Sequence, residues 1–203
     1  MPELGLFPLG VVLLPTEQMP LHIFEDRYQE LIRECLELDR EFGLVYADEE
    51  GLREVGTRAV VTDVLDDFED GRMNVLVEGR ARFRLVELTS GRSFHTGLVD
   101  AFEEEDDPAE PDDTARALGL FRRLVELTGA EVEAPPAESQ QFSFELAGRF
   151  EFAPELKQRL LQLRSERRRV KLLCEFLAAA AVAVEREGEA AQRAASNGKV
   201  DPR

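Results

Sequence analysis

The sequence of 203 residues carries 42 acidic and 25 basic residues, a formal net charge of −17 at pH 7, and 43% of its residues are hydrophobic. This length fits one large domain or two small ones with a sizeable core. The acidity argues against a general phosphate-binding surface, because such surfaces depend on clustered Lys and Arg, so we do not expect nucleic acid as a partner.

The N-terminal third predicts short strands followed by a helix. Leu6–Pro8, Val11–Leu14 and Pro20–Phe24 are apolar runs in which prolines confine any strand to an edge or an interruption. Asp26 then stands where a carboxylate favours the start of a helix. Apolar residues recur at helical spacing behind it, so one face of this helix is expected to be buried: Tyr28, Leu31, Ile32 and Cys35.

Residues 42–102 predict further strands. The acidic-glycine tripeptide Glu69–Gly71 has the chemistry of a hairpin turn between Val55–Leu65 and Met73–Val77. Polar and apolar residues then alternate from Arg80 to Leu85, which places Arg80, Arg82 and Arg84 on one face of a strand. Phe94–Phe102 is the last strand candidate.

The C-terminal part predicts helices. Residues 1–105 are assigned to a β-rich subdomain, and the acidic, Pro-containing residues 106–113 to a solvated connection that lacks the Gly turn of a calcium loop. Residues 114–187 are assigned to one helical subdomain. Thr114 and Ser165 are expected to cap helices, Pro154 to open one and Gly129 to end one. The polar tail, residues 188–203, is expected to be disordered.

Several of these segments together resemble a known family. LFPLG, PLHIFEDRYQELI, VGTRAVVTDV, DGRMNVLVEGRARFRLVEL and LKQRLLQLRSERRRVKLL occur in the order found in the substrate-binding N-terminal domain of the ATP-dependent protease Lon. The resemblance covers about residues 4–187. It implies an α+β fold, with a mixed, β-rich, barrel-like (PUA-like) subdomain followed by a C-terminal helical bundle. It also implies binding of protein without cleavage.

The chain shows no motif for nucleotide or metal chemistry. Its single Gly-Lys pair, Gly198-Lys199, is not part of a phosphate-binding loop, and no serine lies in a G-x-S-x-G elbow. His22 and His95 lack the spacing of zinc ligands with respect to Cys35 and Cys174, so we expect no metal, no cofactor and no disulfide framework. No apolar stretch reaches about 18 residues and the N-terminus lacks the pattern of a secretory leader, so we expect a cytoplasmic protein without membrane contact.

Three functions remain as hypotheses. The first is a non-catalytic module that binds exposed apolar or unfolded polypeptide segments, or a protein partner, without ATP, through Phe7, Leu9, Met19 and Phe24 beside an edge strand. The alternative is binding of a small anion or an RNA fragment by Arg80, Arg82 and Arg84. A peptidase is the third and least favoured.

Overall fold

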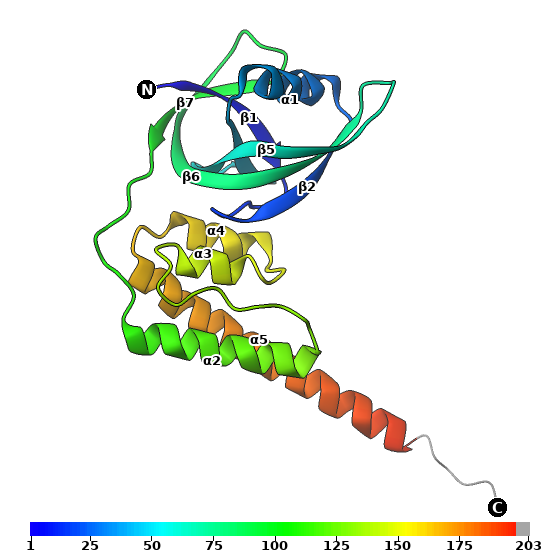
Figure 1. Cartoon of the computed structure of the whole chain (residues 1–203), viewed down its shortest axis with the longest axis vertical. Coiled ribbons are helices and arrows are strands. Elements are labelled where there is room, and N and C mark those ends of the chain that lie inside the picture. Colours follow the sequence, from blue (N-terminus) through cyan, green and yellow to red (C-terminus); the bar gives the residue numbers. More distant parts are fainter. Residues whose placement is uncertain (198–203) are drawn as a thin grey trace, which may run out of the picture. The chain divides into compact units, whose positions relative to one another are not determined.

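The computed structural model describes residues 1–197, which form two compact units (Figure 1). The first unit comprises Met1–Asp106 and Phe144–Arg164, and the second comprises Asp107–Ser143 and the segment that begins at Ser165. The strands are β1 (Glu3–Leu9), β2 (Gln18–Ile23), β3 (Phe42–Asp48), β4 (Gly51–Leu52), β5 (Val55–Asp67), β6 (Met73–Thr89) and β7 (His95–Ala101). The helices are α1 (Asp26–Leu38), α2 (Pro111–Thr128), α3 (Phe142–Ala147), α4 (Pro154–Gln162) and α5 (Glu166–Asn197).

The strands of the first unit form one sheet that closes on itself. Their order is β1-β7-β6-β5-β3-β4, and β1 also pairs with β3 in parallel, so the edge strand β1 meets the other side of the sheet. All other pairings are antiparallel. This closed, β-rich sheet combined with helices confirms the predicted α+β class. Closure removes most free strand edges, and the exceptions are important for the site.

The long strand β6 organises this sheet, because it pairs with β2, β5 and β7. The pairs Ala59–Gly79 and Thr57–Arg82 show that two steps along β5 match three along β6, so an extra residue lies in β6 between Gly79 and Arg82. Gly79 packs against the loop that follows β1: a Cβ atom there would lie 2.1 Å from the carbonyl oxygen of Leu14. The position therefore requires glycine.

The core of the first unit lies between α1 and the sheet. The predicted apolar face of α1 is buried against side chains of β1, β3 and β6, including Phe7, Phe42 and Val75. A second cluster at the other end of the barrel centres on Phe83, with Leu4, Leu6, Val45 and Val99. Val11–Leu14, predicted as a strand, is an irregular and mostly buried segment, whose Leu13 carbonyl oxygen accepts a hydrogen bond from the Thr57 hydroxyl (2.6 Å).

Helix α4 belongs to the sheet-containing unit, which differs from the prediction of one helical subdomain over 114–187. Three polar contacts join α4 to the rest of this unit. Gln158 Nε2 donates to the Val55 carbonyl oxygen (3.0 Å), the Tyr46 hydroxyl donates to Glu155 (3.0 Å), and the nearly buried Lys157 pairs with Glu17. An apolar stripe in the sequence does not reveal partners of this kind.

The second unit is built on α2 packed against α5. Some of the residues predicted to begin or end its helices do so, and one does not. Gly129 ends α2 at φ +67°, and the Ser165 hydroxyl accepts a hydrogen bond from the Arg168 backbone N–H (3.0 Å), as predicted for a cap. Thr114, however, lies inside α2, because that helix begins three residues earlier, at Pro111.

The acidic connection carries ion pairs, and the tail differs from the prediction. Asp107 and Glu110 pair with Arg167 at 2.9 and 2.8 Å, and most of residues 106–113 are exposed. The predicted absence of a calcium site there stays a prediction. Helix α5 continues to Asn197, beyond the expected start of disorder at residue 188, and residues 198–203 lie outside the described part of the chain.

A candidate polypeptide-binding surface on the first unit

Strand β2 has one free edge. It pairs with β6 from Gln18–Glu78 to Ile23–Met73, and among the described residues no strand pairs with its other side. Pro20 lies in the middle of this strand. Because proline has no N–H for a ladder, its nitrogen is placed on the unpaired side, and the backbone groups of Gln18 and His22 then face that side too. The edge can therefore offer N–H and C=O groups to an incoming strand.

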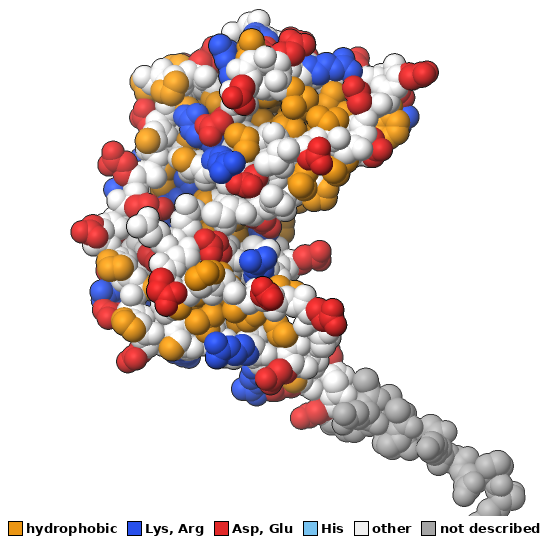
Figure 2. Space-filling view, in the orientation of Figure 1, with side chains coloured by type: hydrophobic (Ala, Val, Ile, Leu, Met, Phe, Trp, Pro, Cys, Tyr) orange, Lys and Arg blue, Asp and Glu red, His pale blue; other side chains and the backbone are white. Residues whose placement is uncertain are grey.

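Two apolar side chains of β2 itself, Met19 and Leu21, are partly buried on its core-facing side. Leu9 of β1 and Val61 of β5 are also partly buried and pack against the same core. Figure 2 shows hydrophobic side chains gathered on the visible face of this unit, in the region between α1 and β2. Partly exposed apolar side chains that rest on a packed core form a firm surface for another apolar group.

The four residues expected to contact a polypeptide differ in exposure. Phe7 is only 5% exposed and stacks on Tyr28 with ring centroids 4.1 Å apart, so it is a core residue and not a surface contact. Leu9 and Met19 lie partly exposed beside the core, and Phe24 is 61% exposed just after β2. Gln29 Nε2 donates to the Phe24 carbonyl oxygen (3.1 Å), which fixes the backbone at this position.

A second surface lies on the outside of the same strands, and we call it the outer face. It belongs to the ribbon of β2, the first half of β6 and the second half of β5, where Pro20, Leu76 and Asp63 form one row across the strands. The next row on this face, towards the hairpin turn, is a hydrogen-bonded chain in which His22 Nδ1 donates to Asn74 Oδ1 (2.7 Å) and Asn74 Nδ2 donates to Asp66 Oδ2 (2.8 Å).

Two phenylalanines extend the outer face towards the hairpin turn. The Phe24 ring stacks on the His22 ring, with centroids 6.0 Å apart, and the Arg72 guanidinium lies 5.6 Å from the Phe68 ring centroid. The sequence pattern singled out Phe24 but missed Leu21, Asn74, Asp66 and Phe68. The hairpin-turn signal at Glu69–Gly71 could have predicted that Phe68 and Arg72 lie opposite each other. No local sequence signal predicts the register of β2 on β6.

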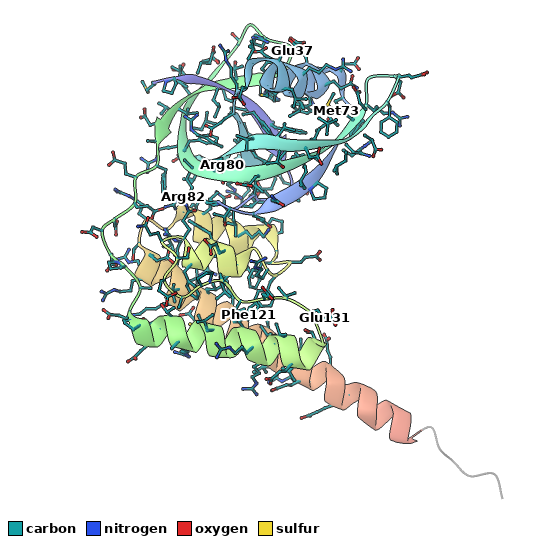
Figure 3. The ribbon with its side chains drawn as sticks, viewed as in Figure 1. Glu37, Met73, Arg80, Arg82, Phe121 and Glu131 are labelled. Carbon is teal, nitrogen blue, oxygen red and sulfur yellow. The ribbon has the colours of Figure 1, made fainter. Side chains whose placement is uncertain are left out.

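The three arginines of β6 do not form one surface. Arg80 is exposed and pairs with Glu78 (3.0 Å), whereas Arg82, two residues further along β6 in Figure 3, is buried. The Arg82 guanidinium donates to the carbonyl oxygens of Leu161 and Leu163 and pairs with Glu104. Arg84 lies over the Phe102 ring (5.5 Å). Arg82 lies over the same ring (4.7 Å), so it shares the face of Arg84, as the alternation predicts. Its guanidinium is not available to an anion from solvent, because the end of α4 and Glu104 cover it.

The residues considered for metal or thiol chemistry lie apart. Among the residues that the structure describes, no group of three or more His, Cys, Asp or Glu side chains is placed to hold a metal ion. Cys35 and Cys174 are free and buried, and burial, with a smaller effect of Glu34, raises the pKa of the Cys35 thiol to about 11. Within residues 1–197, no helix is long and apolar enough to cross a membrane.

The fold places the chain in a class of α+β proteins built on a closed sheet that has solved representatives. The crystal structure of a Lon N-terminal domain protein from Xanthomonas campestris aligns with 85% of this chain and 97% of its own, with a TM-score of 0.69 and 27% identity. The N-terminal domain of a Lon protease from the Mycobacterium avium complex has the same fold, with a TM-score of 0.67 over 87% of this chain and 98% of its own, at 15% identity.

Sequence comparison gives the family. A family model described as the ATP-dependent protease La (LON) substrate-binding domain matches residues 3–179, so the chain belongs to this family. A Lon protease from Parabacteroides distasonis is 29% identical over 138 residues, which are 62% of this chain but 16% of that relative. The chain thus matches about a sixth of that protease's length. The resemblance that the sequence motifs suggested is confirmed.

Proposed function

We propose that this chain is a non-catalytic protein-binding module that binds extended, apolar segments of unfolded polypeptide along the free edge of β2. The observation that supports the proposal best is the combination of an unpaired strand edge with partly exposed apolar side chains beside it. An added strand would gain main-chain hydrogen bonds from the edge, while its inward side chains contact Leu9, Met19 and Leu21. Phe24 would contact the segment at the end of β2.

The arrangement also supports binding without cleavage. Cleavage of a bound segment needs a nucleophile and a base within hydrogen-bonding reach of each other, and the sequence shows no motif that provides them. We propose that polypeptide is held and released unchanged. Purified protein should leave an unfolded casein-like substrate intact with and without ATP, as followed by gel electrophoresis over hours.

The main test is a titration with an extended apolar peptide, followed by fluorescence anisotropy. We expect a dissociation constant of roughly 10–100 μM, in the weak range usual for short extended segments. Phe24→Ser should weaken binding by at least about fivefold, as expected for removal of an exposed aromatic contact. Leu88→Ser is the matched control, because Leu88 is also a half-exposed apolar side chain, near the end of β6.

Backbone methylation of the peptide tests whether a strand is added. An added strand uses N–H groups of alternate residues only, so methylating one alternate set should abolish binding and methylating the other should spare it. Equal effects of the two sets would argue against strand addition. No binding of any unfolded segment at tens of micromolar would contradict the proposed function as a whole.

A further inference from the structure

The outer face is an exposed sheet surface with apolar side chains. Because side chains alternate along a strand, Pro20, His22 and Phe24 of the β2 segment share this face. Phe24 is 61% exposed, Phe68 is 40% exposed, and Leu65 at an irregularity of β5 is 49% exposed. The outer face of a sheet that meets only water is normally polar, so clustered exposed aromatic side chains mark it as a contact surface.

Carboxylates surround these apolar side chains. Asp63, Asp66, Asp67 and Glu69 follow one another along the end of β5 and the hairpin turn, and all four are exposed. The nearest arginine in sequence, Arg72, already pairs with Asp70 (2.7 Å). Across the described chain these four carboxylates form no ion pair, and Asp66 is held only by the amide of Asn74. The face is therefore both apolar and negatively charged.

We propose that the outer face selects, among the polypeptides that the module binds, segments in which Lys or Arg residues stand between apolar ones. A cation gains from both features, since it can lie over the exposed ring of Phe24 or Phe68 and close to the carboxylates of β5. An apolar segment with acidic residues meets the same carboxylates with like charge. This inference rests on the proposed function and specifies its substrate class.

The test compares three peptides with identical apolar residues and Lys, Gln or Glu at the intervening positions. We expect the order of affinity Lys, Gln, Glu, with about a tenfold difference between the Lys and Glu peptides at low salt. The difference should shrink as the ionic strength rises towards 0.5 M, because exposed charges are screened. Amide NMR signals near Phe24 and Phe68 should shift more with the Lys peptide than with the Gln peptide.

Paired variants separate this local effect from the net charge of −17. Asp63→Asn combined with Asp66→Asn should weaken the Lys peptide roughly three- to tenfold, as expected for two exposed charges, and should leave the Gln peptide within twofold. Asn keeps an oxygen for the hydrogen bond from Asn74. Asp67→Asn combined with Glu69→Gln repeats the comparison of the Lys and Gln peptides at the hairpin turn, and the Lys peptide should again lose more affinity than the Gln peptide.

The matched control is Glu131→Gln combined with Glu133→Gln, which removes two exposed carboxylates from the second unit. It should change the affinity of the Lys peptide by less than twofold. An equal loss in this control would assign the preference to net charge and overturn the inference. If the Lys and Gln peptides bind equally, the inference fails while the proposed function stands. If none of the three binds, both fail.

Discussion

The guanidinium of Arg82 donates a hydrogen bond to the carbonyl oxygen of Leu163, with Nη1 and O 2.7 Å apart. Leu163 is the residue at which α4 ends, so a strand of the sheet holds the end of a helix some 80 residues later in the sequence. An arginine at this place satisfies carbonyl oxygens that have no partner within the helix and favours the negative end of its dipole.

Arg82→Met should therefore destabilise the first unit by about 2–4 kcal/mol, because buried carbonyl oxygens lose their donor. Arg80→Met is the control: Arg80 is exposed and makes one surface ion pair, so about 0.5 kcal/mol or less is expected. Urea unfolding followed by circular dichroism measures both. Equal, small losses in the two variants would show that the contact of Arg82 with α4 contributes little.

Gly79→Ala should destabilise the same unit by about 3 kcal/mol, because a Cβ atom would lie 2.1 Å from the Leu14 carbonyl oxygen. The backbone hydrogen bonds between Gly79 and the segment Thr16–Glu17 (2.8 and 2.9 Å) leave little room for relaxation. A Cβ atom on Gly10 would meet nothing within 4 Å, so Gly10→Ala is the control and should be nearly neutral. Thermal unfolding distinguishes the two, and a Gly79→Ala protein of unchanged stability would contradict the close approach.

Ser165→Ala should weaken the start of α5 by about 1–2 kcal/mol. The substitution removes the acceptor for the Arg168 N–H and also the donor to Asp107 Oδ2 (2.7 Å). Hydrogen exchange of the Arg168 amide should speed up roughly tenfold, which corresponds to a local loss of this size. Ser90→Ala, at an exposed position, is the control. Unchanged exchange at Arg168 would indicate that the cap is dispensable.

Cys35 should react slowly with iodoacetamide, because only the thiolate reacts and a pKa of about 11 leaves on the order of one thiolate in a thousand at pH 8. A thiol with its ordinary pKa of 9.0 reacts about 100-fold faster under these conditions. The rate should rise about tenfold per pH unit until the pH approaches 11. A Cys174→Ala protein isolates the signal, and labelling in urea gives the unprotected rate. Fast labelling of the folded protein at pH 8 would disagree with the burial of this thiol.

Local signals in the sequence located the parts of the fold that depend on neighbouring residues. Pro154, Ser165 and Gly129 mark helix ends, and Glu69–Gly71 marks the β5–β6 hairpin, because caps and turns are satisfied within a few residues. The parallel closure of β1 on β3 and the extra residue in β6 depend on partners far away in the sequence. The strict alternation from Arg80 to Leu85 therefore revealed neither the extra residue before Arg82 nor the burial of Arg82 under the end of α4.

The candidate site shows the same limit. Hydrophobicity and proximity to an edge strand suggested Phe7 and Phe24 equally, but the first side chain is in the core and the second is exposed. Only the packing of α1 on β1 distinguishes them, because Phe7 finds Tyr28 as a partner. Leu21 and Asn74 became visible as members of the two surfaces once the register of β2 on β6 was known.

The division of the chain into units has a consequence for biosynthesis. The first unit is interrupted by Asp107–Ser143 and needs Phe144–Arg164, including α4, for completion. At about 5–20 residues per second, a ribosome takes roughly 3–12 s to add the residues between Asp106 and Arg164. During that interval the nascent sheet lacks the α4 partners of Glu17, Tyr46 and Arg82, so an expression plasmid that stops after residue 106 should yield insoluble material.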